Sequence, residues 1–473
     1  MDVTPQNPLH ERYASKEMAR LFSSRHRYST WRKIWIALAK AQRELDLPIT
    51  SEQIEQLESA AGDLDLGRVA EIEKQTRHDV VAHLRHFAEQ APEAGGILHL
   101  GATSAFITDN TDALIVRDAL ALTVSRLATV IDALASFAEE HRARPALAYT
   151  HFQPAQLTTV GKRACLWMQD FLSDLEEIER LRLALRCRGA KGTTGTQASF
   201  LTLFGGDHDK VRALDQKIAD FLGFEASWPV TGQTYPRKQD SRVLYGLAGV
   251  AESCHKWGMD LRLLQGVGEL AEPFDEHQVG SSAMAYKRNP VRAERMCGLS
   301  RRVITDCLNG PLNSATQWLE RSLDDSSNRR LVIGDAFLAV DAILSLAGGI
   351  ASGLRVRASA VEARVAQELP FMASETYLME GALRGGDRQD LHERIRQYSL
   401  ESYEKVSAGG TNPLLDLIAA DGTFRLDRQE LENMLDPEAF TGRSRQQVDD
   451  FLEQEVRPAL KQHAPAAVED PRV

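Results

Sequence analysis

The hydrophobic positions of this chain repeat with the spacing of long α-helices. In four stretches apolar residues alternate four and three positions apart, which keeps one seam of a helix against a partner helix at a crossing of about 20°. The four seams run over residues 120–134, 164–178, 243–264 and 333–347. Helices of roughly 25–33 residues would be roughly 35–50 Å long at 1.5 Å per residue. The pattern therefore predicts a central bundle of four long helices.

Shorter helical patterns flank this bundle on both sides. Before residue 104, Trp31, Trp35 and Leu38 share one helix face, and Thr50 begins a capping-box sequence. After about residue 357 glycine and proline become frequent, which indicates shorter helices. We expect an all-α chain with three helical domains, at residues 1–103, 104–356 and 357–473. The long helices carry apolar residues beyond one seam, so we also expect a homo-oligomer built on the bundle.

Composition and charge narrow the class of protein. Of the 473 residues, 43% are hydrophobic and 26% charged, which is ordinary for a soluble globular protein. No uninterrupted apolar run approaches a membrane span of roughly 18 residues, and the first residues lack the pattern of a signal peptide. The five cysteines form no CxxC pair, which indicates reduced thiols. The net charge of −11 argues against nucleic acid. We expect a cytoplasmic protein that binds neither nucleic acid nor membranes.

Polar residues gather in the connections between the predicted helices. Arg77-His78-Asp79 lies near a helix start, where backbone N–H groups favour anions. Thr103 and Ser104 either cap a helix or donate to a carboxylate. A single histidine on a helix, such as His78, is more often a surface or satisfied core residue than a functional one. His151 lies in a polar stretch just before the second long helix. Residues 319–330 carry three arginines and several hydroxyls, and form either a solvated loop or an anion site.

The most distinctive connection is the sequence GSSAMAYKRNP at residues 280–290. Gly280 gives backbone freedom at its start, and Pro290 suits the first turn of a new helix. Two hydroxyls, the ammonium of Lys287 and the amide of Asn289 lie between them. Such groups bind anions or serve acid–base chemistry, although a polar loop between helices has a similar composition.

Several common kinds of active site lack support in the sequence. HExxH, GxSxG and GxGxxG are absent, and the glycine-rich stretch 189–199 lacks the phosphate-loop pattern. The thirteen histidines are scattered. We therefore expect no metal and no cofactor.

The remaining serine, histidine, lysine, asparagine, threonine and arginine side chains suit a β-elimination. This reaction needs a base for a proton next to a carboxylate, an acid for the departing heteroatom, and donors for the charge that develops. Serine is a poor base unless a closed loop surrounds its alkoxide with donors and cations. A glycine-bounded loop that contains Lys287 meets this requirement.

The order GSSxMxxKxNP resembles the signature loop of the fumarase/aspartase superfamily, whose usual form is GSSxMPxKxNP. Ala285 replaces the usual proline, a difference that bears on the stiffness of the loop and not on its chemical groups. The superfamily's other two signature regions match residues 101–104 and 150–155. Within the superfamily the chain is similar to the adenylosuccinate lyase family, through residues 12–15, 77–79, 150–156, 281–290 and 323–330.

The resemblance implies a role for each matched residue. Ser281 is the general base that takes the β-proton of a succinyl group, and it is preferred to Ser282 on the family pattern alone. His151 is the general acid for the leaving nitrogen, with Glu294 orienting it. The succinyl carboxylates are held by Lys287, Asn289, Thr103 and Ser104. The other substrate contacts are Arg12, Tyr13, Arg77, His78, Asp79, Gln233, Arg295, Arg321, Ser326 and Arg330.

The resemblance also implies a homotetramer whose sites take residues from three subunits. The implied reaction cleaves adenylosuccinate to AMP and fumarate, and the succinylated imidazole-carboxamide ribotide (SAICAR) to AICAR and fumarate. Such substrates carry about −4 charge near pH 7, which suits planar arginine groups. One alternative is another lyase of the superfamily, such as argininosuccinate lyase, whose phosphate-free substrate has less need of Arg12 and residues 321–330. A second alternative is a non-catalytic structural relative, which the presence of Ser281, His151 and Lys287 disfavours.

Overall fold

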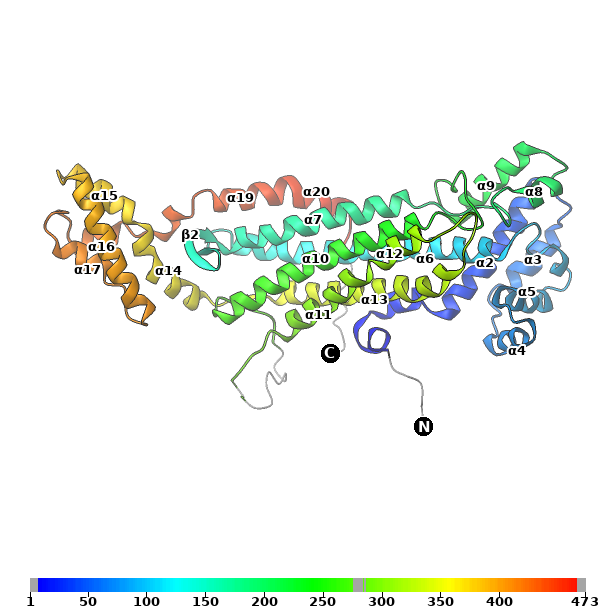
Figure 1. Ribbon diagram of the computed structural model, residues 1–473, viewed down its shortest axis with the longest axis horizontal. Coiled ribbons are helices and arrows are strands. Elements are labelled where there is room, and N and C mark those ends of the chain that lie inside the picture. Colours follow the sequence, from blue (N-terminus) through cyan, green and yellow to red (C-terminus); the bar gives the residue numbers. More distant parts are fainter. Residues whose placement is uncertain (1–6, 275–283, 285, 466–473) are drawn as a thin grey trace.

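The computed structural model describes residues 7–274, 284 and 286–465, and its centre is an elongated bundle of long helices (Figure 1). The bundle consists of α6 (Ser104–Glu140), α7 (Val160–Ala184), α10 (Lys238–Gly266) and α13 (Asp324–Gly353). Each helix contains one of the predicted seams, so the predicted all-α fold class is confirmed. At 37 residues α6 is longer than expected, because neither glycine nor proline occurs between residues 104 and 140.

The N-terminal region is a set of shorter helices at one end of the bundle (Figure 1). Trp31 and Trp35 are almost completely buried, as their shared face predicted, and the capping box at Thr50 is formed. The elements are η1 (Leu9–Tyr13), α1 (Lys16–Leu21), α2 (Ser24–Glu44), α3 (Ser51–Ala60), α4 (Leu66–Thr76), α5 (Asp79–Gln90) and η2 (Gly95–Ile97).

A β-hairpin interrupts the helical pattern where the sequence predicted only a loop. Strand β1 (Pro145–Thr150) pairs antiparallel with β2 (Gln153–Thr159). The two-residue turn is His151-Phe152, whose φ angles of 55° and 58° are those of a type I′ turn. This turn matches the twist of the strands that it joins. A second small sheet pairs β3 (Leu270–Ala271) with β4 (Arg355–Val356).

The remaining connections carry short helices. They are α8 (Ala198–Leu203), α9 (His208–Leu222), α11 (Val291–Asp306) and α12 (Asn309–Ala315). Residues 319–330 are not wholly a loop, because α13 begins at Asp324. Ser326, Arg329 and Arg330 therefore lie on its first two turns, where their relative positions are fixed by the helix.

The C-terminal helices leave the bundle and then partly return to it. The sequence of elements is α14 (Ala358–Met372), α15 (Ser374–Leu383), α16 (Arg388–Ser407), α17 (Leu414–Ala420), α18 (Arg428–Asn433), η3 (Pro437–Phe440), α19 (Ser444–Phe451), η4 (Leu452–Val456) and α20 (Arg457–Gln462). Tyr377, Leu391 and Phe424 belong to a separate hydrophobic core, whereas Val448 and Val456 pack into the core of the bundle. The division into domains at residues 103 and 356 stays a prediction.

Within the described residues, one helix has the length and apolar composition of a membrane span. It is α13, and 83% of its apolar window is buried inside the protein, as in the core helix of a soluble protein. All five cysteines are free, as expected.

Candidate active site

A cavity of about 290 Å³ lies where α2, α5, α6 and α13 meet. Four residues from the sequence prediction line it: Asp79, Arg321, Ser326 and Arg330. Arg330 is two-thirds exposed and lies 3.3 Å from the carboxylate of Asp79, so the pair joins α13 to the start of α5. A cavity with arginines from two segments and a hydroxyl from a helix start is suited to an anionic group.

Part of the wall of this cavity is a network of buried ion pairs that the sequence did not reveal. Arg237 donates to Asp325 at 2.7 Å and makes two further contacts with Asp109, at 3.1 and 3.2 Å. Arg329 donates to Asp240 at 2.7 Å. All five side chains are buried, and together they join α6, α10 and α13 at the wall of the cavity. The network fixes the first turns of α13, which carry Ser326 and Arg330.

The network also sets the charge state of the cavity wall. Burial raises the pKa of Asp112, but Arg27 and Arg329 outweigh burial and lower its pKa below the ordinary value. Arg27 lies 2.7 Å from that carboxylate. Burial lowers the pKa of Arg321, an effect that Asp325 opposes at a distance of 3.2 Å. Paired arginines of this kind stay charged near neutral pH.

His78 and Ser104 are brought together at the same end of the bundle. The Oγ of Ser104 lies 3.3 Å from Nε2 of His78, whose Nδ1 accepts the N–H of Val81 as the cap of α5. Thr103 is the residue before α6, and its side chain makes no capping hydrogen bond. Arg77 is exposed and ends α4 in a left-handed conformation, with φ 54°. The local fold thus turns the Arg77-His78-Asp79 segment toward the start of α6.

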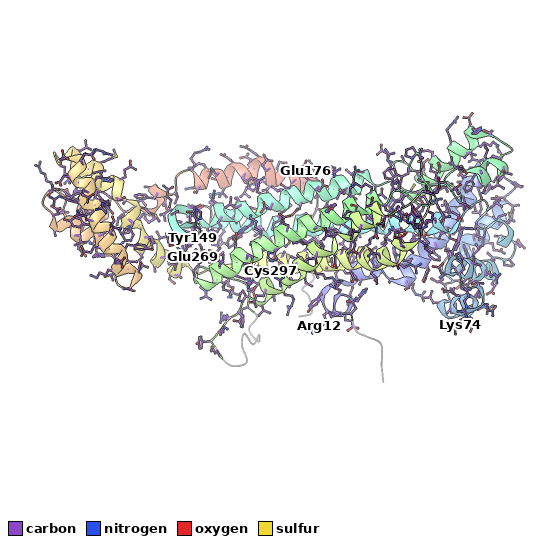
Figure 2. The ribbon with its side chains drawn as sticks, viewed as in Figure 1. Arg12, Lys74, Tyr149, Glu176, Glu269 and Cys297 are labelled. Atoms are coloured by element: carbon purple, nitrogen blue, oxygen red, sulfur yellow. The ribbon has the colours of Figure 1, made fainter. Side chains whose placement is uncertain are left out.

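Two further predicted regions lie beside this cluster. The backbone N–H of Gln233 donates to the carbonyl of Glu320 at 2.9 Å, which places Gln233 next to Arg321. Its side-chain amide donates to the carbonyl of Thr193 at 3.0 Å. Arg12 and Tyr13 lie on η1, which packs against α13, and Arg12 is exposed (Figure 2).

His151 lies elsewhere, at the tip of the β1–β2 hairpin. Figure 1 shows this hairpin near the end of the bundle that carries α14, opposite the end that carries α5. His151 is exposed, and the neighbouring Phe152 is 46% exposed. One chain therefore does not bring the predicted general acid to the cavity that holds Arg321 and Arg330.

The signature loop forms a third location. Gly280, Ser281, Ser282 and Ala285 lie outside the described residues. Lys287 is exposed and Asn289 is half-buried, close to the start of α11. Glu294 and Arg295 follow in the first turns of that helix. The orientation of His151 by Glu294 stays a prediction.

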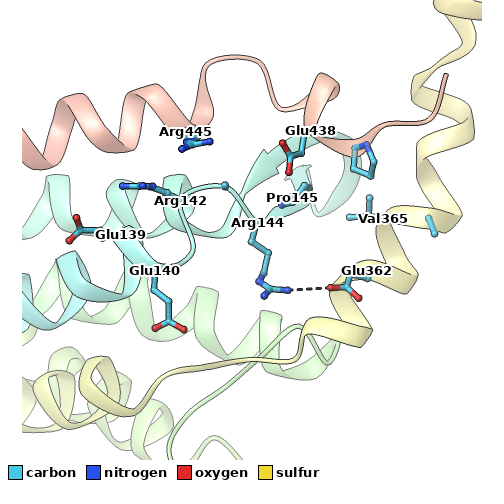
Figure 3. Close-up of a pocket in the computed structure, with 12 residues that line it drawn as sticks. Glu139, Glu140, Arg142, Arg144, Pro145, Glu362, Val365, Glu438 and Arg445 are labelled. Carbon is cyan, nitrogen blue, oxygen red and sulfur yellow. Dashed lines mark hydrogen bonds and ion pairs between the residues drawn. The ribbon is translucent and has the colours of Figure 1, made fainter. Parts of the chain in front are cut away.

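A larger cavity, of about 790 Å³, contains none of the predicted residues (Figure 3). Two of its arginines have carboxylate partners nearby: Arg144 with Glu362 at 3.2 Å, and Arg142 with Asp449 at 3.3 Å. Its lining carries four glutamates and three arginines, whereas the lining of the cavity beside Arg330 carries five arginines and four aspartates, so the smaller cavity is the more favourable one for an anion. Among residues 7–274, 284 and 286–465, no group of three or more His, Cys, Asp or Glu side chains could hold a metal ion.

Comparison with known proteins places this fold in a class of lyases. Residues 11–305 match a family model described as "Lyase", and residues 370–451 match one described as "Adenylosuccinate lyase C-terminus". The structure is similar to that of a 3-carboxy-cis,cis-muconate lactonizing enzyme from Pseudomonas putida, with a TM-score of 0.80, 24% identity, and coverage of 96% of this chain and 100% of that one. A fumarate lyase from Mesorhizobium sp. BNC1 gives 0.78 at 23% identity, covering 95% and 100%. At this level of identity the two structures establish the fold alone.

Sequence relatives narrow the class further. Adenylosuccinate lyase from Saccharomyces cerevisiae is 48% identical over 458 residues, which are 96% of this chain and 95% of the relative. Adenylosuccinate lyase from Schistosoma mansoni is 46% identical with the same coverage. The chain belongs to the adenylosuccinate lyase family.

Proposed function

We propose that this lyase cleaves adenylosuccinate to AMP and fumarate, and SAICAR to AICAR and fumarate, in purine nucleotide biosynthesis. The observation that carries the proposal is the cavity in which Arg321, Arg330 and Ser326 lie close together beside Asp79. Two arginines and a hydroxyl suit a nucleotide phosphate, which a substrate such as argininosuccinate lacks. His78 and Ser104, 3.3 Å apart, supply further polar contacts at the same end of the bundle.

The reaction needs an acid and a base on opposite sides of the bond that breaks. In the proposal Ser281 takes the β-proton of the succinyl group, and His151 protonates the departing nitrogen with Glu294 orienting it. Lys287, Asn289, Thr103 and Ser104 hold the succinyl carboxylates while negative charge develops on them. Arg12 and Tyr13 extend the phosphate side, and Gln233 and Arg295 complete the pocket. Arg77, His78 and Asp79 make further substrate contacts.

The proposal includes a homotetramer with shared sites. In one chain the cavity lies toward the end of the bundle that carries α5, whereas the His151 hairpin lies toward the end that carries α14 (Figure 1). The bundle also leaves large apolar side chains exposed, among them Leu183 at 61%, Leu263 at 42% and Leu331 at 70%. Exposed apolar faces of this kind favour burial against other copies of the chain. We further propose that the enzyme works in the cytoplasm.

Fumarate release, followed by its absorbance, tests the function. The purified chain should release fumarate from adenylosuccinate and from SAICAR, and none from argininosuccinate. A His151→Ala variant is the matched control, because it should keep its fold and lose nearly all activity. Release from argininosuccinate but not from the nucleotides would reassign the substrate, and no release from any of the three would support a non-catalytic role.

A further inference from the structure

A buried carboxylate lies behind the hairpin that carries His151. The side chain of Glu269 is 1% exposed and accepts a hydrogen bond from the hydroxyl of Tyr149, two residues before His151 (Figure 2). Arg163 lies 3.4 Å and Arg364 3.2 Å from the same carboxylate. Burial, followed by the bond to Glu269, raises the pKa of Tyr149 to about 12, so its hydroxyl stays a donor at neutral pH.

This cluster joins the hairpin to two other elements. Arg163, on α7, also donates to the carbonyl of Leu147 in β1. Arg364, on α14, donates to the Tyr149 hydroxyl at 3.3 Å. Since His151 and Phe152 form a tight two-residue turn, the position of Tyr149 determines where the turn lies.

A second buried carboxylate, Glu272, lies three residues further along the chain and contacts the start of α11. Glu272 is 5% exposed and accepts the backbone N–H groups of Arg292 and Ala293, both at 3.0 Å. These N–H groups belong to the first turn of α11, whose own preceding residue, Pro290, provides no side-chain cap. Glu272 therefore caps the helix on which Glu294 and Arg295 lie, from a position about 20 residues earlier in the chain.

Glu272 also helps to fix the end of the signature loop, at Arg288. The backbone N–H of Glu272 donates to the side chain of Gln265 at 3.1 Å, and the amide of Gln265 donates to the carbonyl of Arg288 at 2.9 Å. Arg288 lies between Lys287 and Asn289, two of the proposed carboxylate contacts. Residues 269–272 thus contact the β1–β2 hairpin, which carries His151, on one side and the end of the signature loop on the other.

We propose that Glu269 and Glu272 are positioning residues of the lyase reaction: Glu269 fixes the hairpin of the general acid, and Glu272 fixes the end of the signature loop. This inference rests on the proposed function, since it assigns the two carboxylates to the two halves of its site. Neither residue touches substrate in the proposal. Each acts through the element that it holds.

The two carboxylates should give different kinetic signatures. Glu269→Gln and Tyr149→Phe should lower kcat by about 10- to 100-fold. The general acid stabilises only the transition state, so its displacement slows turnover without weakening the binding of substrate. Their KM for adenylosuccinate should change less than about threefold, since the phosphate and carboxylate contacts lie elsewhere. Glu272→Gln should raise KM as well as lower kcat, because Lys287 and Asn289 hold the substrate.

Glu362→Gln is the matched control on α14. Its partner Arg144 is 3.2 Å away and its side chain is 69% exposed, so both kcat and KM should be unchanged.

Mixed tetramers separate a positioning role from a general loss of stability. When His151→Ala and Ser281→Ala chains are reassembled together, every working site takes His151 from a Ser281→Ala chain. Glu269→Gln placed on the Ser281→Ala chains therefore affects all working sites, and placed on the His151→Ala chains it affects none. We expect the first hybrid to lose about as much kcat as the Glu269→Gln homotetramer, and the second to stay within about twofold of the parent hybrid. Glu272→Gln should show the reverse dependence on placement.

Equal losses in both placements would overturn the positioning roles, because a purely structural effect depends only on how much of each substitution the tetramer contains. Full kcat in both the Glu269→Gln and Tyr149→Phe homotetramers would also overturn the role of Glu269. If the parent hybrid recovers no activity, the shared-site part of the proposed function fails instead. The kcat and KM values of the homotetramers then decide the inference by themselves.

Discussion

At the scale of single residues, substitution of the two loop serines tests the proposed base. Ser281→Ala should fold and bind nucleotide normally but lose about 10²–10⁴-fold in turnover, the usual contribution of a positioned base. Ser282→Ala should be milder. Steady-state fumarate release and binding of AMP, measured on both variants, check this. Retention of more than a tenth of the wild-type activity in Ser281→Ala would contradict the assignment.

The two cavity arginines should act mainly on substrate binding. Arg321→Ala or Arg330→Ala should raise KM more than it lowers kcat, because a phosphate contact is similar in the ground and transition states. A charged contact of this type contributes on the order of 1.5–3 kcal/mol. The effect should be larger for Arg321, which is 22% exposed and held by Asp325, than for Arg330, which is 67% exposed.

Substrate-saturation curves for the two variants measure this prediction. Arg443→Ala serves as a control, since Arg443 is an exposed surface residue paired with Asp450. An unchanged KM in both cavity variants would remove this cavity from the substrate site.

The sequence indicated the candidate substrate residues more readily than the buried ion pairs that hold them in place. Arg321, Ser326 and Arg330 stood out because arginines and hydroxyls were close together in one short segment. Asp109 and Arg237 did not, because each looks like an isolated charge next to an apolar seam. They become partners only when α6 and α10 meet, with the two side chains 3.1 Å apart. The only local signal was a charge at a buried position of a helix, which points to a partner without identifying it.

At the scale of elements, a buried carboxyl between α7 and α10 should make stability depend on pH. Burial, followed by the nearby Asp170 and Glu252, raises the pKa of Asp174 to about 7 against the opposing hydrogen bond with Ser253. Among the residues that the structure describes, its Oδ2 has no hydrogen-bond partner. The folded chain therefore binds this proton more tightly than the unfolded chain, whose carboxyl titrates near 4. Stability from this group is present below about pH 4 and falls as pH rises to about 7.

Asp174→Asn should remove that dependence. A tenfold difference in proton affinity between the folded and unfolded chains corresponds to about 1.4 kcal/mol, so the variant should gain at most about 4 kcal/mol above pH 7, and progressively less toward pH 4. Thermal unfolding midpoints of the two proteins at pH 5, 6, 7 and 8 check this. A gain that does not grow with pH would show that Asp174 is not the group responsible.

Periodicity explains which elements the sequence revealed. The four long helices were predictable because each seam repeats over several turns, and their spacing reports helical geometry directly. The hairpin was not predictable, because its turn is His151-Phe152. The sequence pairs that usually indicate a type I′ turn are Asn-Gly and Asp-Gly. The early start of α13 was also missed, because charged residues at the beginning of a helix resemble a polar loop in sequence.

At the scale of the whole molecule, the distribution of the predicted residues argues for assembly. The cavity beside Arg330 and the hairpin with His151 lie toward opposite ends of a bundle whose longest helix, α6, has 37 residues. At 1.5 Å per residue such a helix is roughly 55 Å long. A substrate whose phosphate is bound at this cavity must also bring its leaving nitrogen within roughly 3 Å of the acid that protonates it. Bundles of this length can bring the two regions together when several copies of the chain pack side by side, so that loops from different chains converge at one site.

The last prediction tests this arrangement by complementation. His151→Ala and Ser281→Ala homotetramers should each be nearly inactive, because every site lacks its acid or its base. If the two variants are unfolded, mixed one to one and reassembled, each position of a site is filled at random from the two kinds of chain. About a quarter of the sites then receive both intact residues, given random assembly in a symmetric oligomer. Fumarate release should recover toward roughly a quarter of wild type, while each variant refolded alone stays inactive. If gel filtration shows that hybrid tetramers formed and the mixture is still inactive, His151 and Ser281 come from one chain, and the shared-site arrangement is wrong.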